Sequence, residues 1–220
     1  MTSTEERFLK DVAQHSMQVI HSDGVYRQIR FQQPEHSWLH RFDLITWPGY
    51  LCITGDCGTY VFSRSRDMFE FFRHGGTSTP GVPLYINESY WAEKLEASDC
   101  NGRNANEVRT WSEEKFEDWI KARYIEHVRQ EMAGMPKERK ELRRELKELV
   151  LQFSNEKHEA LAAARDFDEH GLSFDSYWDV DFTDWDYGFI WCLYAIAWGI
   201  RQFDAQCPMA GAAQQQGAAA

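Results

Sequence analysis

The densest group of residues able to do chemistry is a run of carboxylates near the C-terminus, Asp179-x-Asp181-x-x-Asp184-x-Asp186. Hard cations bind several carboxylate oxygens, so this spacing makes the run a candidate metal site. The run departs from the calcium-loop pattern, because its sixth position is Asp184 instead of glycine and its twelfth is Ile190 instead of Glu. We therefore interpret the run as solvated acids on a loop, with Asp184 capping the next helix, and assign no metal ligand.

Histidines and cysteines offer a second candidate metal site. Among the histidines in the first third of the chain, only His36 and His40 are close in sequence. On an extended strand such a pair lies on one face about 13 Å apart, which is too far to share a zinc ion without a bend. Cys52 and Cys57 flank a predicted hairpin turn, where packing cysteines are commoner than ligands. We predict no cofactor.

A candidate nucleophile is found in Ser63-Arg64-Ser65-Arg66, which follows a predicted strand. No GxSxG elbow, Walker loop, HExxH or GxGxxG motif accompanies it. The two arginines can hold a phosphate, but charged residues at a strand end commonly protect a sheet edge from aggregation. We assign no catalytic residue, and the sequence favours a protein that is not an enzyme.

The charge of the chain is unevenly placed. The 35 acidic and 24 basic residues give a net charge of −11, and residues 166–220 contain nine of the acids and a single base, Arg201. Residues 166–186 include no Lys or Arg at all. Such a surface repels phosphates, which argues against direct nucleic-acid binding through this segment. It favours a cationic partner, either a metal ion or a protein surface that itself binds nucleic acid.

Three features indicate an intracellular protein without a membrane span. The longest strongly apolar stretch, residues 189–200, is shorter than the roughly 20 residues that a transmembrane helix needs. The N-terminus is polar and charged where a secretory signal would be apolar. The five cysteines are scattered and form no CxxC pair, which fits a reducing compartment. We predict a cytoplasmic location.

The elements that must position these residues begin with a predicted antiparallel β-meander of about four strands. Alternating apolar and polar residues indicate the strands, and Pro48-Gly49 and Gly55-Asp56-Cys57-Gly58 indicate the turns. A short helix within residues 4–20 is expected to precede the Ser22-Asp23-Gly24 turn. The predicted strands lie in residues 25–31, 36–47, 50–54 and 59–63.

Helices are predicted for most of the remaining chain. A hydroxyl cap at Ser112 and apolar residues every three or four positions indicate one helix, and Gly134-Met135-Pro136 separates it from the next. The last helix is apolar nearly all round and is therefore expected to be buried. The predicted helices lie in residues 67–73, 87–97, 112–128, from about 137 to 153, and 184–206.

Together these elements predict an α+β fold with an N-terminal antiparallel β-meander packed by helices, a helical middle region and a buried C-terminal helix. We predict one domain, residues 1–207, made of a sheet-containing part (1–74), a helical part (75–165), and an acidic segment with the core helix (166–207). Residues 75–83 and 99–106 are predicted to be loops. Residues 208–220 lack large apolar anchors and are predicted to form a flexible tail.

Three sequence blocks carry a resemblance to a known family. They are FDLITWPGYLCITGDCGTYVFSR (residues 42–64), DMFEFF (67–72) and FIWCLYAIAWGIRQF (189–203). They resemble a family of small proteins encoded by temperate phages and prophages. The resemblance implies a phage origin and a site of action in the bacterial cytoplasm, and it transfers no active site. Residues 75–170 match no block of that family, which leaves their role open.

Small phage proteins outside the virion and replication sets often bind a host protein, including components of CRISPR and other defence systems. We therefore expect a non-enzymatic accessory protein that inhibits or modulates a nucleic-acid-handling host protein through an acidic, aromatic-rich surface. Two alternatives remain open: a metal-dependent hydrolase acting on a phosphate-containing substrate through the 179–186 carboxylates, and a virion or structural protein. A homodimer also remains open. The expected partner-binding residues are Asp175, Tyr177, Trp178, Asp179, Asp181 and Asp184.

Overall fold

The fold comes from a computed structural model that describes residues 3–34, 37–73, 82–99 and 108–207. The chain forms two compact units. Unit 1 comprises residues 1–108 and 185–220, and unit 2 comprises residues 109–184. These boundaries differ from those of the three parts predicted from the sequence, and the single domain over residues 1–207 stays a prediction.

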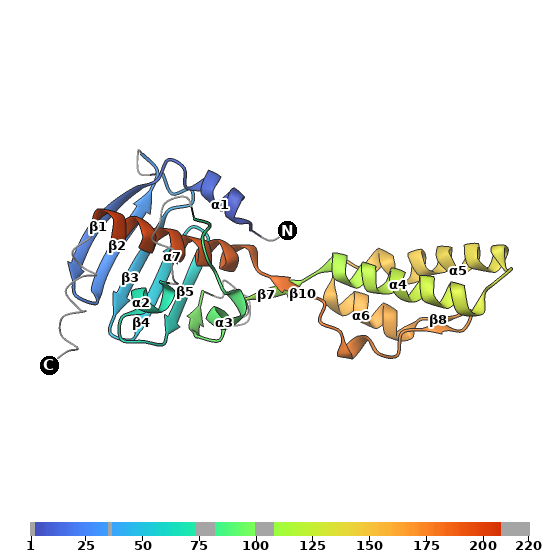
Figure 1. The fold of residues 1–220 in the computed structure, drawn as a ribbon. Helices are drawn as coiled ribbons and strands as arrows, with labels where there is room; N and C mark the ends of the chain where they lie inside the picture. The colour runs from blue at the N-terminus through green and yellow to red at the C-terminus, as the bar shows by residue number, and fades with distance from the viewer. Residues whose placement is uncertain (1–2, 35–36, 74–81, 100–107, 208–220) are drawn as a thin grey trace. The chain divides into compact units, whose positions relative to one another are not determined.

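Unit 1 contains a six-stranded antiparallel sheet in which every strand pairs with its neighbours along the chain (Figure 1). The meander predicted from the sequence is therefore confirmed, with two more strands than expected. Its turns are tight, and Gly24 and Gly49 have positive φ values of 57° and 89°, which glycine adopts without a steric penalty. The strands are β1 (Ser16–Asp23), β2 (Tyr26–Gln32), β3 (Phe42–Trp47), β4 (Tyr50–Gly55), β5 (Gly58–Ser63) and β6 (Leu95–Ser98).

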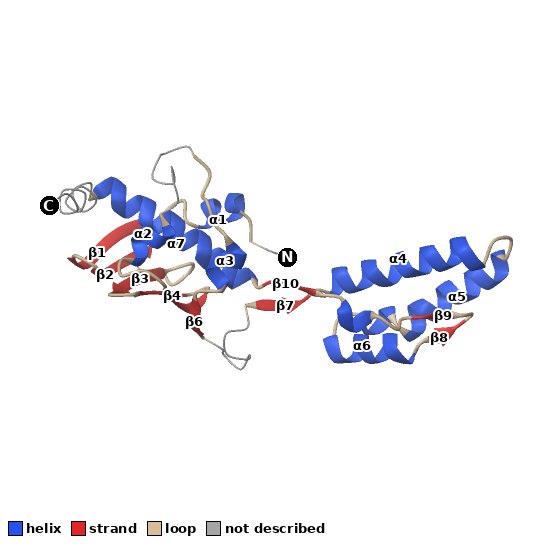
Figure 2. Ribbon diagram, turned by 60° about the horizontal axis from the view of Figure 1, so that its bottom comes forward, coloured by secondary structure: helices blue, strands red, loops and turns tan. Residues whose placement is uncertain are grey.

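The helix α7 (Tyr187–Gln206) lies along one face of this sheet (Figure 2). Apolar side chains alternate along the strands, so that residues such as Leu44 and Ile53 are fully buried against the helix. A Cβ added to Gly199 would lie 2.8 Å from Leu44 Cδ1 and 3.1 Å from Phe31 Cε2, so glycine permits this close approach. The prediction of a buried C-terminal helix is confirmed.

Three short helices complete unit 1: α1 (Glu5–Asp11), α2 (Met68–Phe72) and α3 (Glu88–Ala92). Their apolar residues join the core formed by the sheet and α7. The Asp67 side chain caps α2 by accepting a hydrogen bond from Phe69 N at 2.9 Å, as the acidic start of the predicted helix indicated.

Two helix predictions were too long. The helix predicted within residues 4–20 ends at Asp11, and residues 16–20 belong to β1, where Val19 pairs with Ile29. The helix predicted for residues 87–97 ends at Ala92, and residues 95–98 form β6. In both segments, pairing with a strand distant in sequence outweighs the local apolar spacing.

Unit 2 has its own apolar core, built from residues of three helices and the segments that follow them. Ser112 caps the first helix and Pro136 begins the second, as the sequence predicted. The helices are α4 (Glu113–Glu131), α5 (Pro136–Leu149) and α6 (Lys157–Asp166), with short 3-10 turns η2 (Leu151–Phe153) and η3 (Tyr177–Asp179). Two strand pairs are also present: β7 (Arg109–Trp111) with β10 (Thr183–Trp185), and β8 (Asp168–Glu169) with β9 (Leu172–Ser173).

The α+β fold class predicted from the sequence is confirmed by this arrangement. Most of the two predicted loops and the whole predicted tail, residues 208–220, lie outside the described residues. Within the described part of the chain, no helix combines the length and the apolar character needed to cross a bilayer.

Candidate functional site

The acidic segment predicted to bind a partner folds against the core of unit 2. Phe174 and Phe182 are buried there, and Tyr177 is partly buried against the same core. Trp178 is different, because 67% of its surface is exposed. Of the two aromatic residues predicted to bind a partner, Tyr177 therefore packs against the core of unit 2, and Trp178 faces solvent.

Two of the predicted partner-binding carboxylates form ion pairs within unit 2. Arg109 Nη2 lies 2.9 Å from Asp181 Oδ2, and Lys115 Nζ lies 2.6 Å from Asp184 Oδ1. The pKa of Asp181 is lowered, chiefly by the hydrogen bond from Thr183, and the pKa of Asp184 is lowered chiefly by the hydrogen bond from Lys115. Both carboxylates are therefore charged at neutral pH and already have a cation beside them.

The expected helix cap was assigned to the wrong aspartate. Asp184 lies in β10, and it is Asp186 that caps α7 by accepting a hydrogen bond from Phe189 N at 3.1 Å. The helix therefore begins three residues later than predicted, because β10 pairs with β7 before the helix starts.

The other two carboxylates of the predicted set lie on either side of Trp178 in sequence. Asp175 and Asp179 are exposed, and within the described residues neither forms an ion pair. Asp175 Oδ2 accepts a hydrogen bond from Ser173 Oγ at 3.1 Å. We call Asp175, Trp178 and Asp179 the Trp178 surface.

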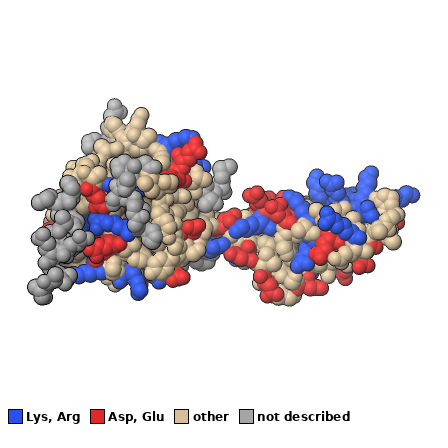
Figure 3. Space-filling model, viewed as in Figure 1, with Lys and Arg blue, Asp and Glu red and all other residues tan. Residues whose placement is uncertain are grey.

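A cavity of about 310 Å³ lies beside Trp178. Its walls are largely apolar, and Lys157 is the one basic residue among them. Figure 3 shows Lys and Arg gathered over α5, whereas acidic side chains lie along the lower edge of unit 2 and at its upper left. The Trp178 surface thus combines an exposed aromatic ring, an adjoining apolar hollow and two carboxylates. The walls include Leu161, Tyr177, Trp178, Val180 and Phe182.

A second candidate site lies in unit 1, in a cavity of about 480 Å³ next to the start of α7. Three aspartates line it, together with a histidine and a cysteine, and its lining includes no Lys or Arg. The cavity therefore favours a cation over an anion. The lining residues are His40, Gly55, Asp56, Cys57, Gly58, Tyr60, Asp99, Asp186, Tyr187 and Gly188.

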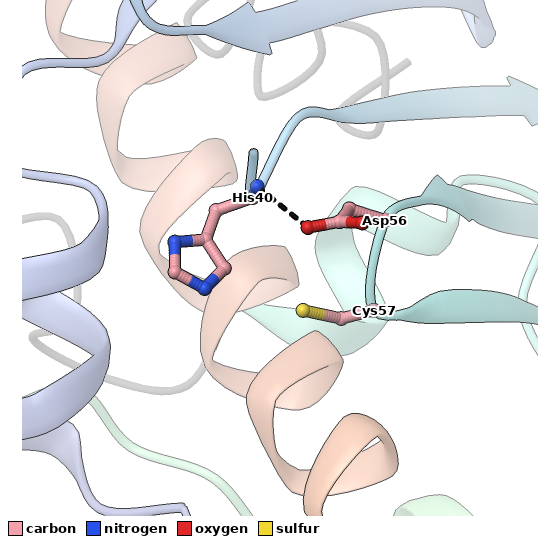
Figure 4. A group of neighbouring side chains, drawn as sticks. All are labelled: His40, Asp56 and Cys57. Atoms are coloured by element: carbon pink, nitrogen blue, oxygen red, sulfur yellow. Dashed lines mark hydrogen bonds between the residues drawn. The ribbon is translucent and has the colours of Figure 1, made fainter. Parts of the chain in front are cut away.

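His40, Asp56 and Cys57 form a compact group in this cavity (Figure 4). One ligand atom from each residue lies within 4.8 Å of the other two. Asp56 and Cys57 are in the β4–β5 turn, and His40 precedes β3 with a positive φ of 54°. Two hydrogen bonds from backbone amides join the two segments: His40 N donates to the side-chain atom Asp56 Oδ2 at 2.9 Å, and Asp56 N donates to Arg41 O at 3.0 Å.

The residues around this group restrain the His40 ring and favour the protonated form of Cys57. The His40 ring stacks on Trp191 with centroids 5.6 Å apart, and His40 Nε2 lies 3.8 Å from Asp11 Oδ2. Burial, followed by the charges of Asp56, Asp11 and Asp186, raises the pKa of Cys57 to about 12. A protonated thiol is a poor nucleophile, so the arrangement does not support a catalytic cysteine.

Sequence reasoning did not bring these three residues together. His40 was compared with His36, which lies outside the described residues, and Cys57 was compared with Cys52, which pairs in register with Val61 in the middle of the sheet. The available signal was the turn sequence Gly55-Asp56-Cys57-Gly58, which places two ligand types between glycines.

Among the described residues, this is the one group of three or more His, Cys, Asp or Glu side chains close enough to hold a metal ion. The carboxylate run of residues 179–186 does not form such a group, since two of its members pair with cations and Asp186 caps α7. The Trp178 surface in unit 2 and the His40 cavity in unit 1 are therefore the two candidate sites. No protein-family model, curated protein or solved structure matches this chain.

Proposed function

We propose that this chain is a non-enzymatic phage accessory protein that binds a bacterial host protein through the Trp178 surface. The observation that carries the proposal is the 67% exposure of Trp178, with Asp175 and Asp179 close to it in sequence. Exposed tryptophans next to an apolar hollow are typical anchors of protein interfaces, because a large rigid ring is desolvated when the partner binds.

The charge of the surface indicates the chemistry of the partner. Asp175 and Asp179 have no ion pair among the described residues, whereas Asp181 and Asp184 do. The first two carboxylates attract a basic surface, and the second two fix the segment through Arg109 and Lys115. The predicted set of six residues thus divides into three that face the partner, Tyr177 that supports Trp178, and two that hold the segment in place.

A basic surface that binds nucleic acid is the partner class that fits best. Phosphates would be repelled by the same carboxylates, so nucleic acid itself is not the ligand of this surface. The net charge of −11 accelerates encounter with a cationic protein. Together with the sequence resemblance, this supports a bacterial nucleic-acid-handling defence complex, such as a CRISPR effector, as the target in the cytoplasm.

The first test is capture of partners from a nuclease-treated lysate of the bacterial host, washed at low and high salt, with the wild type and a Trp178→Ala variant. We expect a nucleic-acid-binding protein to be retained by the wild type and released by salt. With the purified partner, Trp178→Ala is expected to weaken binding by at least about 30-fold, because a buried aromatic anchor is worth about 2 kcal/mol or more. The combination Asp175→Asn with Asp179→Asn should mainly reduce the association rate and its salt dependence.

The matched control is Trp38→Ala in unit 1. Trp38 is 70% exposed, but the Arg41 guanidinium carbon lies 4.2 Å from its ring centroid, so its setting is cationic. This variant should bind the partner as the wild type does. Equal loss of binding by both tryptophan variants, or full binding by Trp178→Ala, would contradict the proposal.

A further inference from the structure

We propose that unit 1 carries a zinc site whose ligands are His40, Asp56 and Cys57. The three side chains come from two segments 16 residues apart, and two hydrogen bonds donated by backbone amides, at 2.9 and 3.0 Å, join those segments. The site is independent of the Trp178 surface, because every residue of it belongs to unit 1.

The geometry requires only a small closure around the ion. Zinc bonds of about 2.0–2.3 Å in a tetrahedron place the ligand atoms roughly 3.3–3.8 Å apart. Here the ligand atoms lie within 4.8 Å of one another, so movements of about 1 Å complete the site. Figure 4 shows a ring nitrogen of His40 and the sulfur of Cys57 facing the same space, with the Asp56 carboxylate beside them. His40 N donates a hydrogen bond to Asp56 Oδ2. The turn that supplies Asp56 and Cys57 is therefore already linked to His40, the third ligand.

The types of ligand select the metal. Sulfur, imidazole nitrogen and carboxylate oxygen together are a typical zinc set, whereas calcium and magnesium prefer oxygen alone. A zinc ion bound by one thiolate and one carboxylate also leaves no net charge, which removes the repulsion between Cys57 and Asp56 when both are ionised. The cavity supplies further negative charge from Asp186 and Asp99, which line it.

The surroundings restrain the ligands as an outer shell does in zinc proteins. Asp11 Oδ2 lies 3.8 Å from His40 Nε2 and accepts a hydrogen bond from Trp191 Nε1 at 3.0 Å, while Trp191 stacks on the histidine ring. On the other side, a Cβ added to Gly188 would lie 2.4 Å from the carbonyl oxygen of Cys57, so α7 packs directly against the turn. Three protein ligands leave a fourth position facing the cavity of about 480 Å³, which a water molecule can fill.

The test uses the full chain, kept reduced and stripped of metal with a chelator. Cobalt(II) serves as the probe, because a cobalt ion bound to a thiolate absorbs in the near ultraviolet by charge transfer. We expect one cobalt ion per chain with this absorption, its displacement by one equivalent of zinc, and a higher melting temperature with zinc. Cys57→Ser should abolish the charge-transfer band and weaken zinc binding at least about 100-fold, the upper range of the losses seen even for outer-shell residues.

The matched control is Cys52→Ser, which removes a partly buried cysteine from the same sheet but outside the group. It should bind cobalt with the wild-type spectrum. Two further variants are expected to keep the fold. His40→Asn is compatible with the positive φ at position 40, which asparagine tolerates. Asp56→Asn retains a side-chain oxygen that can accept the hydrogen bond from His40 N. Absence of the charge-transfer band in the wild type, or zinc binding by all three ligand variants as tight as in the wild type, would overturn the proposal.

Discussion

Replacing Arg27 by methionine is expected to destabilise unit 1 by about 3–5 kcal/mol, because the buried carboxylate of Asp67 would lose its countercharge. The two side chains are only 5% and 6% exposed, and both guanidinium Nη atoms donate to the carboxylate oxygens at 2.8 Å. The guanidinium carbon also lies 4.6 Å from the centroid of the Phe69 ring. Urea unfolding, followed by circular dichroism, measures the loss as a lower midpoint.

The double variant Arg27→Met with Asp67→Asn separates the ion pair from the packing. Asparagine removes the buried charge and can still cap α2 through the hydrogen bond from Phe69 N. The double variant should therefore be more stable than Arg27→Met alone, although one more residue has changed. A double variant as unstable as the sum of the two single variants would show that charge burial is not the source of the loss. As an exposed control, Lys10→Met breaks the Glu6–Lys10 pair, whose side chains are 80% and 73% exposed, and should leave the urea midpoint almost unchanged, because water already screens this pair.

The same pair predicts how stability changes in acid. Burial alone would raise the pKa of Asp67, but hydrogen bonds from Arg27 and the Phe69 amide outweigh burial and lower that pKa below its usual value. A carboxyl group with a lower pKa in the folded state stabilises the protein fully above its unfolded pKa of about 3.9, and this contribution is lost as pH falls through the folded pKa. Below about pH 4, wild-type stability should therefore fall more steeply with pH than that of the double variant.

The sheet and the long helices were predictable because their signals are local. Pro48-Gly49 and the glycines at 55 and 58 mark turns whose strands pair with their immediate neighbours, so the hydrophobic alternation also fixes the register. Residues 16–20 and 95–97 were assigned to helices instead, because their apolar spacing fits a helix as well as a strand. Only the partner strands, β2 and β5, decide between the two.

The candidate sites were less predictable because their essential contacts are distant in sequence. The acidic run contains no base, yet Arg109 and Lys115 pair with Asp181 and Asp184 from about 70 residues away. Similarly, the i, i+4 spacing of two histidines gave no information about His40, which meets the β4–β5 turn through the hydrogen bond from its backbone N to Asp56 Oδ2. Local composition therefore indicated which residue types were present, while the tertiary fold determined which of them meet.

Replacing Trp191 by alanine is expected to destabilise unit 1 by about 3–5 kcal/mol, since it leaves a large cavity in the core. Trp191 has no exposed surface and lies at the centre of an aromatic cluster, with ring centroids 5.1 Å from Phe8 and 5.6 Å from Phe42. The loss is measured by urea unfolding, and the exposed Trp38→Ala serves as the control with an expected change within about 0.5 kcal/mol.

Trp191→Phe distinguishes packing from hydrogen bonding at the same position. Phenylalanine fills much of the space but removes the Nε1 donor to Asp11, so about 1–3 kcal/mol should be lost, less than for alanine. The two variants should differ in this order, and equal stability losses would mean that the hydrogen bond outweighs the cavity.

Because Trp191 also stacks on His40 and holds Asp11 beside it, Trp191→Phe should in addition weaken zinc binding about 10-fold while the three ligands remain in place. Such a loss in a folded variant would connect α7 to the proposed zinc site through Trp191, by its stacking on His40, by its hydrogen bond to Asp11, or by both.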